Sequence, residues 1–459
     1  MSYATTVANL YALGHELANQ PAHKFDLAFM RKLLAALGSP EAKLPAVLIA
    51  GTNGKGSTAA TLASILQAAG LRTGLYTSPH LVQINERIRI NGIAVANTDF
   101  ANLHKKAESA AAALLASGEL PWHPSFFEMI TAMAFLHFAE VPVDIAVLEV
   151  GMGGRLDATN VVQPRVSVIA DVALDHQKYL GDTLTEIARE KAGIIWPGVV
   201  VVTLPQMPEA NDAIGNAILE RGARGVNAAQ YVPPVSPNSA QSRNAGVNYQ
   251  QGNERRFGQE YRVQVLGEEI LVQTPLIGRH QLRNVALAIA TAVELNQQEF
   301  KITPQDIERG IRETRWPGRF ERIQHAGREF VLDVAHNPAG AWALRAALSE
   351  QYEDRPFTLV FGAMLDKAIG EMAEILFPLA DRIIATRADN PRAAAPEEIR
   401  QAARRITAEI YEAPNVLAAL QRAEAVTPSG GLVVVTGSIY IVGEAIKVLE
   451  MAGLETKRN

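Results

Sequence analysis

The chain of 459 residues contains no cysteine. Without cysteine it cannot form a disulfide framework or a thiolate metal cluster, and it cannot use a thiol as a nucleophile. Any metal must therefore be bound through oxygen or nitrogen ligands. A chain without cysteine also suits a reducing compartment, so we expect a cytoplasmic protein.

The chain also has a small net charge and no long apolar run, and we expect no N-terminal signal peptide. Its formal net charge of -5 provides no broad basic surface for nucleic acid and no attraction to an anionic membrane. Residues 1–20 include Asn9, His15 and Glu16 and do not resemble a signal peptide, and no apolar stretch approaches the length of a membrane span. We therefore expect no nucleic-acid or membrane partner, and we expect a monomer that binds small molecules.

The residues that are present predict a soluble α/β protein. Hydrophobic residues make up 48% of the chain and charged residues 20%, which is typical of globular proteins. Short apolar runs separated by helix-like segments predict the strands of a doubly wound, mostly parallel sheet, at residues 46–50, 144–150, 166–170 and 199–203. The first run leads through a glycine cluster into a helix-like segment at residues 58–69.

A second alternating series follows the helix-like segment 284–296 and the turn Trp316-Pro317-Gly318. Its expected strands lie at residues 330–334, 358–361, 382–386 and 432–436, with helices such as 340–348 between them. We therefore expect a first domain at residues 1–315 and a second, smaller Rossmann-like α/β domain at residues 316–459. Residues 231–259 are rich in Pro, Asn, Ser, Gln and Gly and are expected to form a surface insertion within the first domain.

The strongest functional signal is a run of seven residues, Gly51-Thr52-Asn53-Gly54-Lys55-Gly56-Ser57. The run follows a predicted strand and opens a predicted helix, the context in which backbone N–H groups surround a polyphosphate and a lysine supplies positive charge. It departs from the usual Walker A spacing because Gly56 separates Lys55 from Ser57. We interpret the run as a nucleotide-binding P-loop whose lysine faces solvent without nucleotide. The alternative is a glycine-rich turn with a solvated lysine.

Three further segments place candidate metal ligands after predicted strands. Glu149 ends an apolar strand just before a glycine cluster, where it either binds Mg²⁺ or pairs with Arg155. Ser78 and His176 are candidate ligands too, although a serine before proline is common in turns and a single histidine is more often structural. Lys191, judged by its spacing alone, is an ordinary solvated helix lysine.

The segments with chemical potential occur in a fixed order along the chain. They are Gly51 to Ser57, Ser78-Pro79-His80, Phe127-Glu128, Glu149 to Asn160, Asp175-His176, Glu190-Lys191-Ala192-Gly193, Pro317-Gly318-Arg319-Phe320-Glu321 and Asp333-Val334-Ala335-His336-Asn337. In this order they resemble the folylpolyglutamate synthase and dihydrofolate synthase family of the Mur ligase superfamily. The match extends from residue 25 to residue 440, and the twelve residues that end at Asn160 are its most specific part.

The resemblance implies an enzyme that uses ATP and Mg²⁺. It implies that ATP is bound by Thr52, Asn53, Gly54, Lys55, Gly56 and Ser57 and, from the far side of a cleft, by Asn284, Arg319 and Asp333. It implies that Mg²⁺ is bound by Ser57, Ser78, Glu149, His176 and Lys191. In this set Lys191 is a carbamate, which turns a cation into an anion that a metal attracts.

The resemblance also implies a pterin site and three catalytic residues. The pterin contacts map onto Phe25, Asp26, Leu27, Ala28, Ser125, Phe126, Phe127, Glu128, Leu156, Asp157 and Ala158. The candidate catalytic residues are Lys55, Lys191 and His336, with helix capping as the alternative role for His336.

The implied activity is ATP-dependent ligation of L-glutamate to a folate or pteroate carboxylate through an acyl phosphate. It stays open whether the acceptor is dihydropteroate, a reduced folate or both. Another Mur-type amino-acid ligase would share the nucleotide site but prefer a UDP-linked substrate. A P-loop kinase or GTPase would leave the second domain and Arg319 unexplained, and a non-catalytic regulatory module would not need Glu149 or His176.

Overall fold

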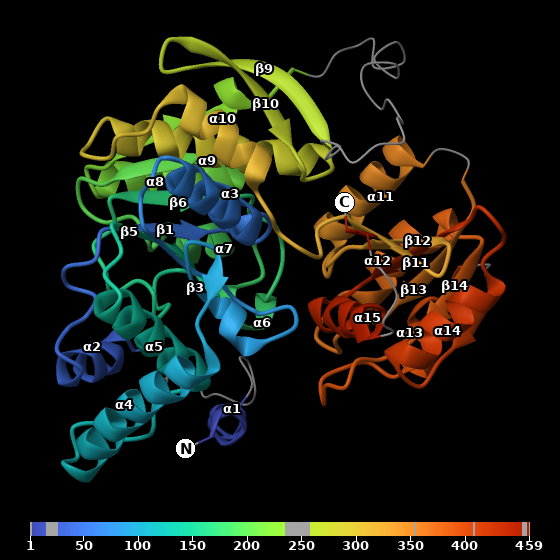
Figure 1. The fold of residues 1–459 in the computed structure, drawn as a ribbon, viewed down its shortest axis with the longest axis horizontal. Coiled ribbons are helices and arrows are strands. Elements are labelled where there is room, and N and C mark those ends of the chain that lie inside the picture. The colour runs from blue at the N-terminus through green and yellow to red at the C-terminus, as the bar shows by residue number, and fades with distance from the viewer. Residues whose placement is uncertain are drawn as a thin grey trace.

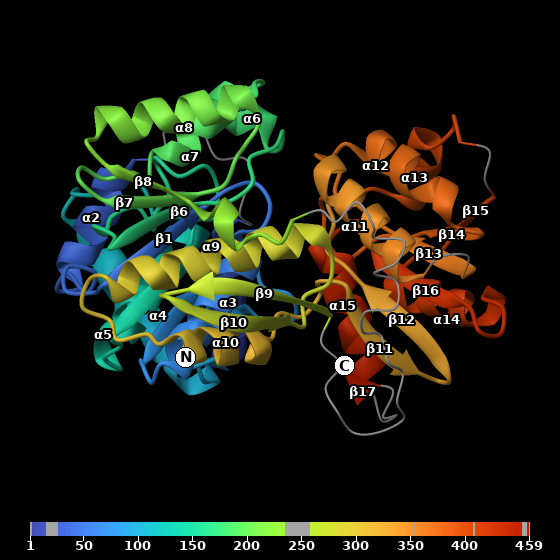
Figure 2. The ribbon, with the colours of Figure 1, turned by 90° about the horizontal axis from the view of Figure 1, so that it is seen from above.

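The computed structural model describes residues 2–14, 26–234, 258–352, 355–406, 409–451 and 457–458. In these ranges the chain forms two α/β halves that lie side by side, each with its own sheet (Figures 1 and 2). The predicted fold class is therefore confirmed. The domain boundary at residue 315 stays a prediction; a connecting segment, residues 314–320, joins the last helix of the first half to the first strand of the second.

The first half is built on an eight-stranded sheet in the order β4-β3-β2-β5-β1-β6-β7-β8. The strands from β2 to β8 in this order run parallel, and β3 and β4 are antiparallel to their neighbours. The four strands that the sequence predicts are present, with ends within one residue of the prediction. The strands are β1 (Ala46–Ala50), β2 (Thr73–Tyr76), β3 (Ile88–Ile90), β4 (Ile93–Ala94), β5 (Ile145–Glu149), β6 (Val166–Ile169), β7 (Val200–Thr203) and β8 (Arg224–Asn227).

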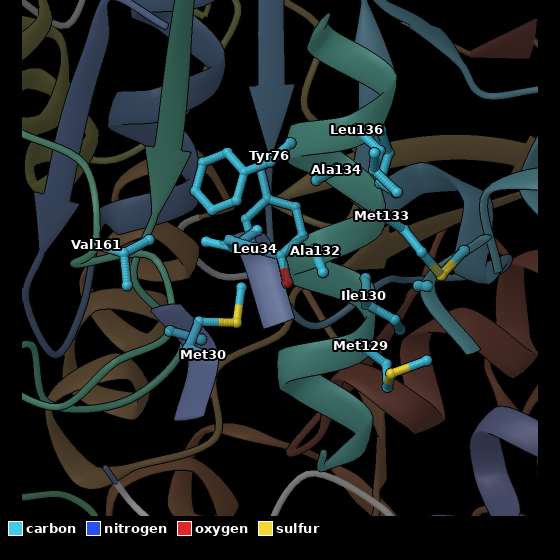
Figure 3. Packing of buried hydrophobic residues seen from close by; sticks show 14 of the residues in the cluster. Met30, Leu34, Tyr76, Met129, Ile130, Ala132, Met133, Ala134, Leu136 and Val161 are labelled. Atoms are coloured by element: carbon cyan, nitrogen blue, oxygen red, sulfur yellow. The ribbon is translucent and has the colours of Figure 1, made fainter. Parts of the chain in front are cut away.

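Helices cover both faces of this sheet because its central strands are apolar on both sides. In β1, Leu48 and Ala50 belong to one core cluster and Val47 and Ile49 to another, since successive side chains of a strand point to opposite faces. The first cluster packs under α1, α2, α4 and α5, and Figure 3 shows part of it. The second packs under α3, α9 and α10.

The helices of the first half differ from the sequence prediction mainly at their starts. The helix predicted from residue 58 begins at Lys55, and the helix predicted from residue 284 begins at Arg279. Most of the predicted insertion, residues 235–257, lies outside the described residues. The helices are α1 (Tyr3–Ala12), α2 (Leu27–Ala36), α3 (Lys55–Ala68), α4 (Asn97–Ala116), α5 (Phe126–Glu140), α6 (Gln177–Leu180), α7 (Leu184–Ala192), α8 (Pro208–Glu220), α9 (Arg279–Asn296) and α10 (Pro304–Glu313), and the hairpin strands β9 (Gln259–Val265) and β10 (Glu268–Thr274) pack beside α10.

The close contact between α3 and α10 depends on Gly310. A Cβ atom at this position would lie 2.3 Å from the Cα of Ile65, and the hydroxyl of Ser64 donates to the Gly310 carbonyl. We expect Gly310→Ala to lower the free energy of unfolding by about 3 kcal/mol, because backbone atoms must move apart. Gly215→Ala in α8 is the matched control, since nothing lies within 4 Å of its added Cβ, and chemical denaturation of both variants measures the difference. If Gly310→Ala and Gly215→Ala had equal free energies of unfolding, α3 and α10 would not require a glycine at position 310.

The second half is built on a seven-stranded sheet in the order β15-β14-β13-β16-β12-β11-β17. β11 is antiparallel to both of its neighbours, and the other pairs are parallel. One face packs under α11, α12 and α13 and the other under α14 and α15. The elements are β11 (Glu321–His325), β12 (Arg328–Leu332), α11 (Pro338–Gln351), β13 (Phe357–Phe361), α12 (Ile369–Leu376), β14 (Arg382–Ala385), α13 (Pro396–Ala402), β15 (Ile410–Glu412), α14 (Val416–Val426), β16 (Leu432–Thr436), α15 (Ile439–Met451) and β17 (Lys457–Arg458).

A search of the described helices for a membrane span gives none that is both long enough and apolar enough.

Candidate active site

A cleft of about 930 Å³ lies between the two halves. The carboxyl ends of β1, β5 and β6 open into it from one side, and those of β12, β13 and β16 from the other. This is the edge at which parallel sheets bind ligands.

The cleft brings together nearly all of the residues that the sequence singles out. Phe25 lies outside the described residues, and Ala28 does not line the cleft. The predicted residues that line it are Asp26, Leu27, Thr52, Asn53, Gly54, Lys55, Gly56, Ser57, Ser78, Ser125, Phe126, Phe127, Glu128, Glu149, Leu156, Asp157, Ala158, His176, Lys191, Asn284, Arg319, Asp333 and His336.

The glycine-rich run forms the loop between β1 and α3. Its Gly54 has φ of 88° and starts the helix without a side-chain cap, so the first N–H groups of α3 are available to an anion. A Cβ atom on Gly54 would lie 2.1 Å from Oδ1 of Asn284. Asn284 is therefore a neighbour of the loop in the first half, and the prediction that it lies across the cleft is wrong. It belongs to α9, which packs against α3.

Lys55 does not point into solvent, contrary to the sequence prediction. Its Nζ donates to the carbonyl oxygens of Gly51 and Thr52 at 3.0 and 3.1 Å. Burial lowers the pKa of Lys55, and the charges of Glu149 and Asp175 oppose that shift. The ammonium group is thus held inside the cleft by the loop itself, in a position from which it can turn to a phosphate.

Lys191 is buried and is not a solvated helix lysine. Its Nζ donates to the carbonyl oxygen of Gly51 at 2.9 Å, so Gly51 accepts from both Lys55 and Lys191. Burial lowers the pKa of Lys191 to about 7, and the positive charge of Lys55 adds to this effect. At neutral pH a substantial fraction of Lys191 is the uncharged amine, which is the form that reacts with CO₂.

Glu149 is placed to bind a cation. It ends β5 beside the loop and accepts the backbone N–H of Ser78 at 3.2 Å. The alternative pairing with Arg155 is wrong, because Arg155 makes an ion pair with Glu190 at 2.9 Å. The Glu149 carboxylate therefore lines the cleft beside Ser78 and not beside Arg155.

The donor atoms around Glu149 suit Mg²⁺ bound together with a nucleotide. The described chain holds no ready-made cluster of three His, Asp or Glu side chains. Mg²⁺ does not require one, because it prefers oxygen ligands and takes several of them from phosphates and water. The hydroxyls of Ser57 and Ser78 are oxygen donors that line the same cleft. Burial lowers the pKa of His176 to about 4, which keeps its imidazole neutral, the form that binds metals.

The two halves are joined across the cleft at Asp175. Its carboxylate pairs with Nζ of Lys367 at 2.6 Å, lies 3.5 Å from Nε2 of His336 and accepts from Asn337 at 3.3 Å. Burial would raise the pKa of Asp175, but the His336 hydrogen bond and the nearby positive charges outweigh it and hold that pKa well below its usual range. His336 is thus a cleft residue, and the helix-capping alternative is wrong because Asn337 caps α11.

Two features of this junction were missed by sequence reasoning. They are Lys367 and Asn337, two residues of the second half that bond to Asp175 of the first. The side chain of Asn337 also donates to Asn53 of the loop at 2.9 Å. Lys367 lies just after β13, so the strand-end rule applied to the second half could have found it. A further contact places α15 against the loop after Pro79, where a Cβ atom on Gly443 would lie 1.9 Å from the Leu81 carbonyl oxygen.

We expect Lys367→Met to open the cleft in the protein without ligands. The change leaves a buried carboxylate without its ammonium partner, which costs up to about 3 kcal/mol at this junction. Small-angle scattering should show a larger radius of gyration. Lys106→Met is the control, because Lys106 pairs with Glu140 at 2.6 Å on the surface of the first half, where a pair contributes less than about 1 kcal/mol. Identical scattering from both variants would show that the ion pair does not hold the halves together.

Arg319 and Asp333 approach the cleft from the second half. Asp333 follows β12 and accepts the backbone N–H groups of Phe320 and Ala335, both at 2.9 Å. Burial lowers the pKa of Arg319, whereas the charges of Asp333 and Glu149 raise it. The guanidinium group thus lies within electrostatic reach of the predicted metal ligand.

Nine of the eleven predicted pterin contacts, all except Phe25 and Ala28, line the same cleft. Ser125 and Glu128 make a capping box at the start of α5, and Asp26 caps α2. Asp157 accepts from the backbone of Met152 and from Thr159. The polar residues of this set therefore shape the turns, and the apolar ones provide the wall of the pocket.

Comparisons with known proteins agree with this geometry. Residues 49–292 match the Mur ligase middle domain, and residues 318–439 match the Mur ligase glutamate ligase domain. The dihydrofolate synthase/folylpolyglutamate synthase of Bacillus subtilis is 34% identical over 429 residues, which cover 93% of this chain and 95% of that protein.

Two solved structures share the whole fold. The Mycobacterium tuberculosis folylpolyglutamate synthase complexed with ADP and AMPPCP is 30% identical, with a TM-score of 0.84 over 98% of this chain and 100% of that chain. An Escherichia coli protein in complex with DHPP and ADP is 27% identical, with a TM-score of 0.82 over 99% of each chain.

Proposed function

Because the chain belongs to the folylpolyglutamate synthase and dihydrofolate synthase family of Mur ligases, we propose that it joins L-glutamate to the carboxylate of a folate or of dihydropteroate with the use of ATP. One observation carries the proposal. The phosphate loop (Gly51 to Ser57), Glu149 and Arg319 of the second half line a single cleft, and the apolar side chains of Leu27, Phe126 and Phe127 line the same cleft.

The reaction must first make the carboxylate reactive, because oxide is a poor leaving group and an amine does not displace it at neutral pH. A carboxylate oxygen of the acceptor attacks the γ-phosphorus of ATP and ADP leaves. The uncharged amine of glutamate then attacks the acyl carbon, the amide bond forms and phosphate leaves. Lys55 and Arg319 neutralise the charge of the transferring group from two sides, which is electrostatic catalysis by positioned cations.

Magnesium bound by Ser57, Ser78, Glu149, His176 and a carbamate of Lys191 would supply further positive charge at the phosphates. Ser57 and Glu149 lie at the ends of neighbouring elements, α3 and β5, so this chain holds the oxygen donors in place before the nucleotide arrives.

The acyl phosphate must also be protected from water. The pairs of Asp175 with Lys367 and His336 hold the second half against the first across the cleft. Closure of this kind excludes water and completes the set of catalytic groups. His336 is then a second-half residue, with Arg319, beside the reacting atoms.

The test is a substrate panel with purified protein, ATP, Mg²⁺ and L-glutamate, analysed by mass spectrometry. The expected products are acceptors that have gained one or more glutamyl residues, together with ADP and phosphate. Dihydropteroate and reduced folate monoglutamate are offered separately, because each alone identifies one of the two activities. ADP release without any glutamyl product, or ligation only to a UDP-linked acceptor, would overturn the proposal.

We also propose that the protein is a monomer in the cytoplasm. The absence of cysteine suits the reducing environment of the cytoplasm. Light scattering on the purified protein should give the mass of one chain, 49.6 kDa, and twice this mass would refute the monomer.

A further inference from the structure

We propose that Trp316 is a positioning residue that docks the connecting segment on the phosphate loop and thereby sets where Arg319 stands against the bound nucleotide. The inference rests on the proposed function, since it concerns the nucleotide site of the same enzyme. Trp316 belongs to residues 314–320, the segment between the two sheets.

The indole ring of Trp316 packs directly on Gly56. A Cβ atom on Gly56 would lie 3.0 Å from Cζ2 and 3.2 Å from Nε1 of that ring. These distances are shorter than ordinary carbon contacts, so a side chain at position 56 would push the ring away. Gly56 is the residue that separates Lys55 from Ser57 and makes the loop depart from the usual spacing. The contact gives a physical reason for a glycine there.

The ring is held in place from a second direction. The guanidinium carbon of Arg89 lies 5.4 Å from the ring centroid, and Arg89 also lies 3.8 Å from Glu86. The Nε1–H of Trp316 is buried without a hydrogen-bond partner among the described residues. Such an orphan donor costs about 1–3 kcal/mol, so the packing of the ring must outweigh this cost. Exceptions to the rule that buried polar groups are hydrogen-bonded are expected mainly at functional sites.

Trp316 is close enough to Arg319 along the chain for the position of the indole ring to affect the position of the guanidinium group. Only Pro317 and Gly318 separate the two residues, and proline fixes its own φ. The carbonyl oxygen of Gly318 accepts from the backbone of Val334 at 3.0 Å and from Nη1 of Arg319 at 3.2 Å. A displaced indole ring therefore displaces the Arg319 side chain, which is the charge that the second half brings to the phosphates.

A small hollow beside the ring supports the same assignment. Trp316 and Arg319 line it together with Ser78 and Glu149. The indole therefore lines the same hollow as the candidate metal ligands Ser78 and Glu149, and it also packs on the loop at Gly56. A single side chain of the connecting segment thus borders both the phosphate-binding and the metal-binding groups of the first half.

A double-mutant cycle tests the contact. Gly56→Ala, Trp316→Ala and the double variant are titrated calorimetrically with a non-hydrolysable ATP analogue and Mg²⁺. Each single change is expected to weaken binding about tenfold, and the cost of Gly56→Ala should fall by about tenfold once the ring is gone. Gly56 could instead be needed only so that phosphate can approach the backbone. The double variant would then lose binding by the product of the two single fold-losses, and this result would overturn the proposal.

A second cycle tests the route through Arg319. Arg319→Ala should weaken binding of the analogue strongly in the wild-type background and only slightly with Trp316→Ala, because the guanidinium is already displaced there. Equal losses in both backgrounds would show that Trp316 does not act through Arg319. Trp316→Phe keeps a ring but shortens the edge that faces Gly56, so in this variant Gly56→Ala should cost less while melting temperature stays near that of the wild type.

Matched controls separate this inference from the proposed function. Trp342→Ala removes a tryptophan that is 57% exposed, and Gly215→Ala adds a methyl group in open space; both should bind the analogue as the wild type does. A wild-type protein that binds no nucleotide would refute the proposed function and the inference together. Normal nucleotide binding by the wild type, together with a double variant whose loss is the product of the losses of Gly56→Ala and Trp316→Ala, would refute the inference alone.

Discussion

Lys55→Ala is expected to abolish ligation and leave the protein folded. The lysine is the cation of the phosphate loop, and its loss removes the charge that neutralises the transferring phosphoryl group. We expect kcat/KM to fall by at least about 10³-fold, the range for removal of a positioned electrostatic group. Turnover measured by ADP release and by glutamyl product should fall together.

The fold should survive this change because Lys55 is not a stabilising cation in the absence of nucleotide. Its ammonium shares the Gly51 carbonyl oxygen with that of Lys191, and burial lowers the pKa of Lys55. The melting temperature without ligands should therefore stay the same or rise. Lys106→Ala is the matched control and should keep full activity, since Lys106 is exposed on α4. Near-normal turnover of Lys55→Ala would remove the loop lysine from the mechanism.

Lys191→Ala should lose most of the activity, and a small carboxylic acid added to the assay should restore part of it. The expected active form of Lys191 is a carbamate, made when the uncharged amine adds to the carbon of CO₂ and releases a proton. A carbamate keeps one N–H, so it can still donate to Gly51 as Nζ does in the structure. Its new carboxylate supplies an oxygen ligand to Mg²⁺, which an ammonium group would repel.

The control for this prediction is Lys191→Arg. Arginine keeps the positive charge and cannot form the carbamate, so neither added acid nor added bicarbonate should restore its activity. Carbamates are lost in acid, so the direct readout is electron density in a crystal grown with bicarbonate, or a ¹³C signal from labelled CO₂. Density that ends at an unmodified ammonium in demonstrably active, Mg²⁺-loaded crystals would disprove the assignment.

The sequence predicts the structure best where an apolar run is followed directly by a glycine-rich turn. The run from Val47 to Ile49 is apolar at every position, so it predicts a strand covered on both faces, and the glycines after it predict the loop. The sequence predicts the start of α3 at residue 58 because glycines at positions 54 and 56 are poor helix formers, whereas the helix begins at Lys55, inside the loop itself.

Contacts between distant segments were not predictable from pattern. Arg155 pairs with Glu190, 35 positions away, in preference to Glu149, because the turn of α7 ends beside it. The burial of Lys191, whose Nζ donates to Gly51 140 positions away, depends in the same way on the tertiary arrangement. Helical periodicity describes one face of one element, and it does not state which other element covers that face.

We expect the contacts across the cleft to limit how fast the enzyme works. Asp175 and Lys367 pair across the cleft in which ADP and the amide product are expected to form, and opening of such a closure often determines kcat. Each kcal/mol added to this ion pair, or to the contact of Leu81 with Gly443, would slow opening about fivefold. A more heat-resistant variant made by tightening this junction is therefore a slower catalyst at ordinary temperature. Heat resistance without loss of speed has to come from the cores of the two separate sheets.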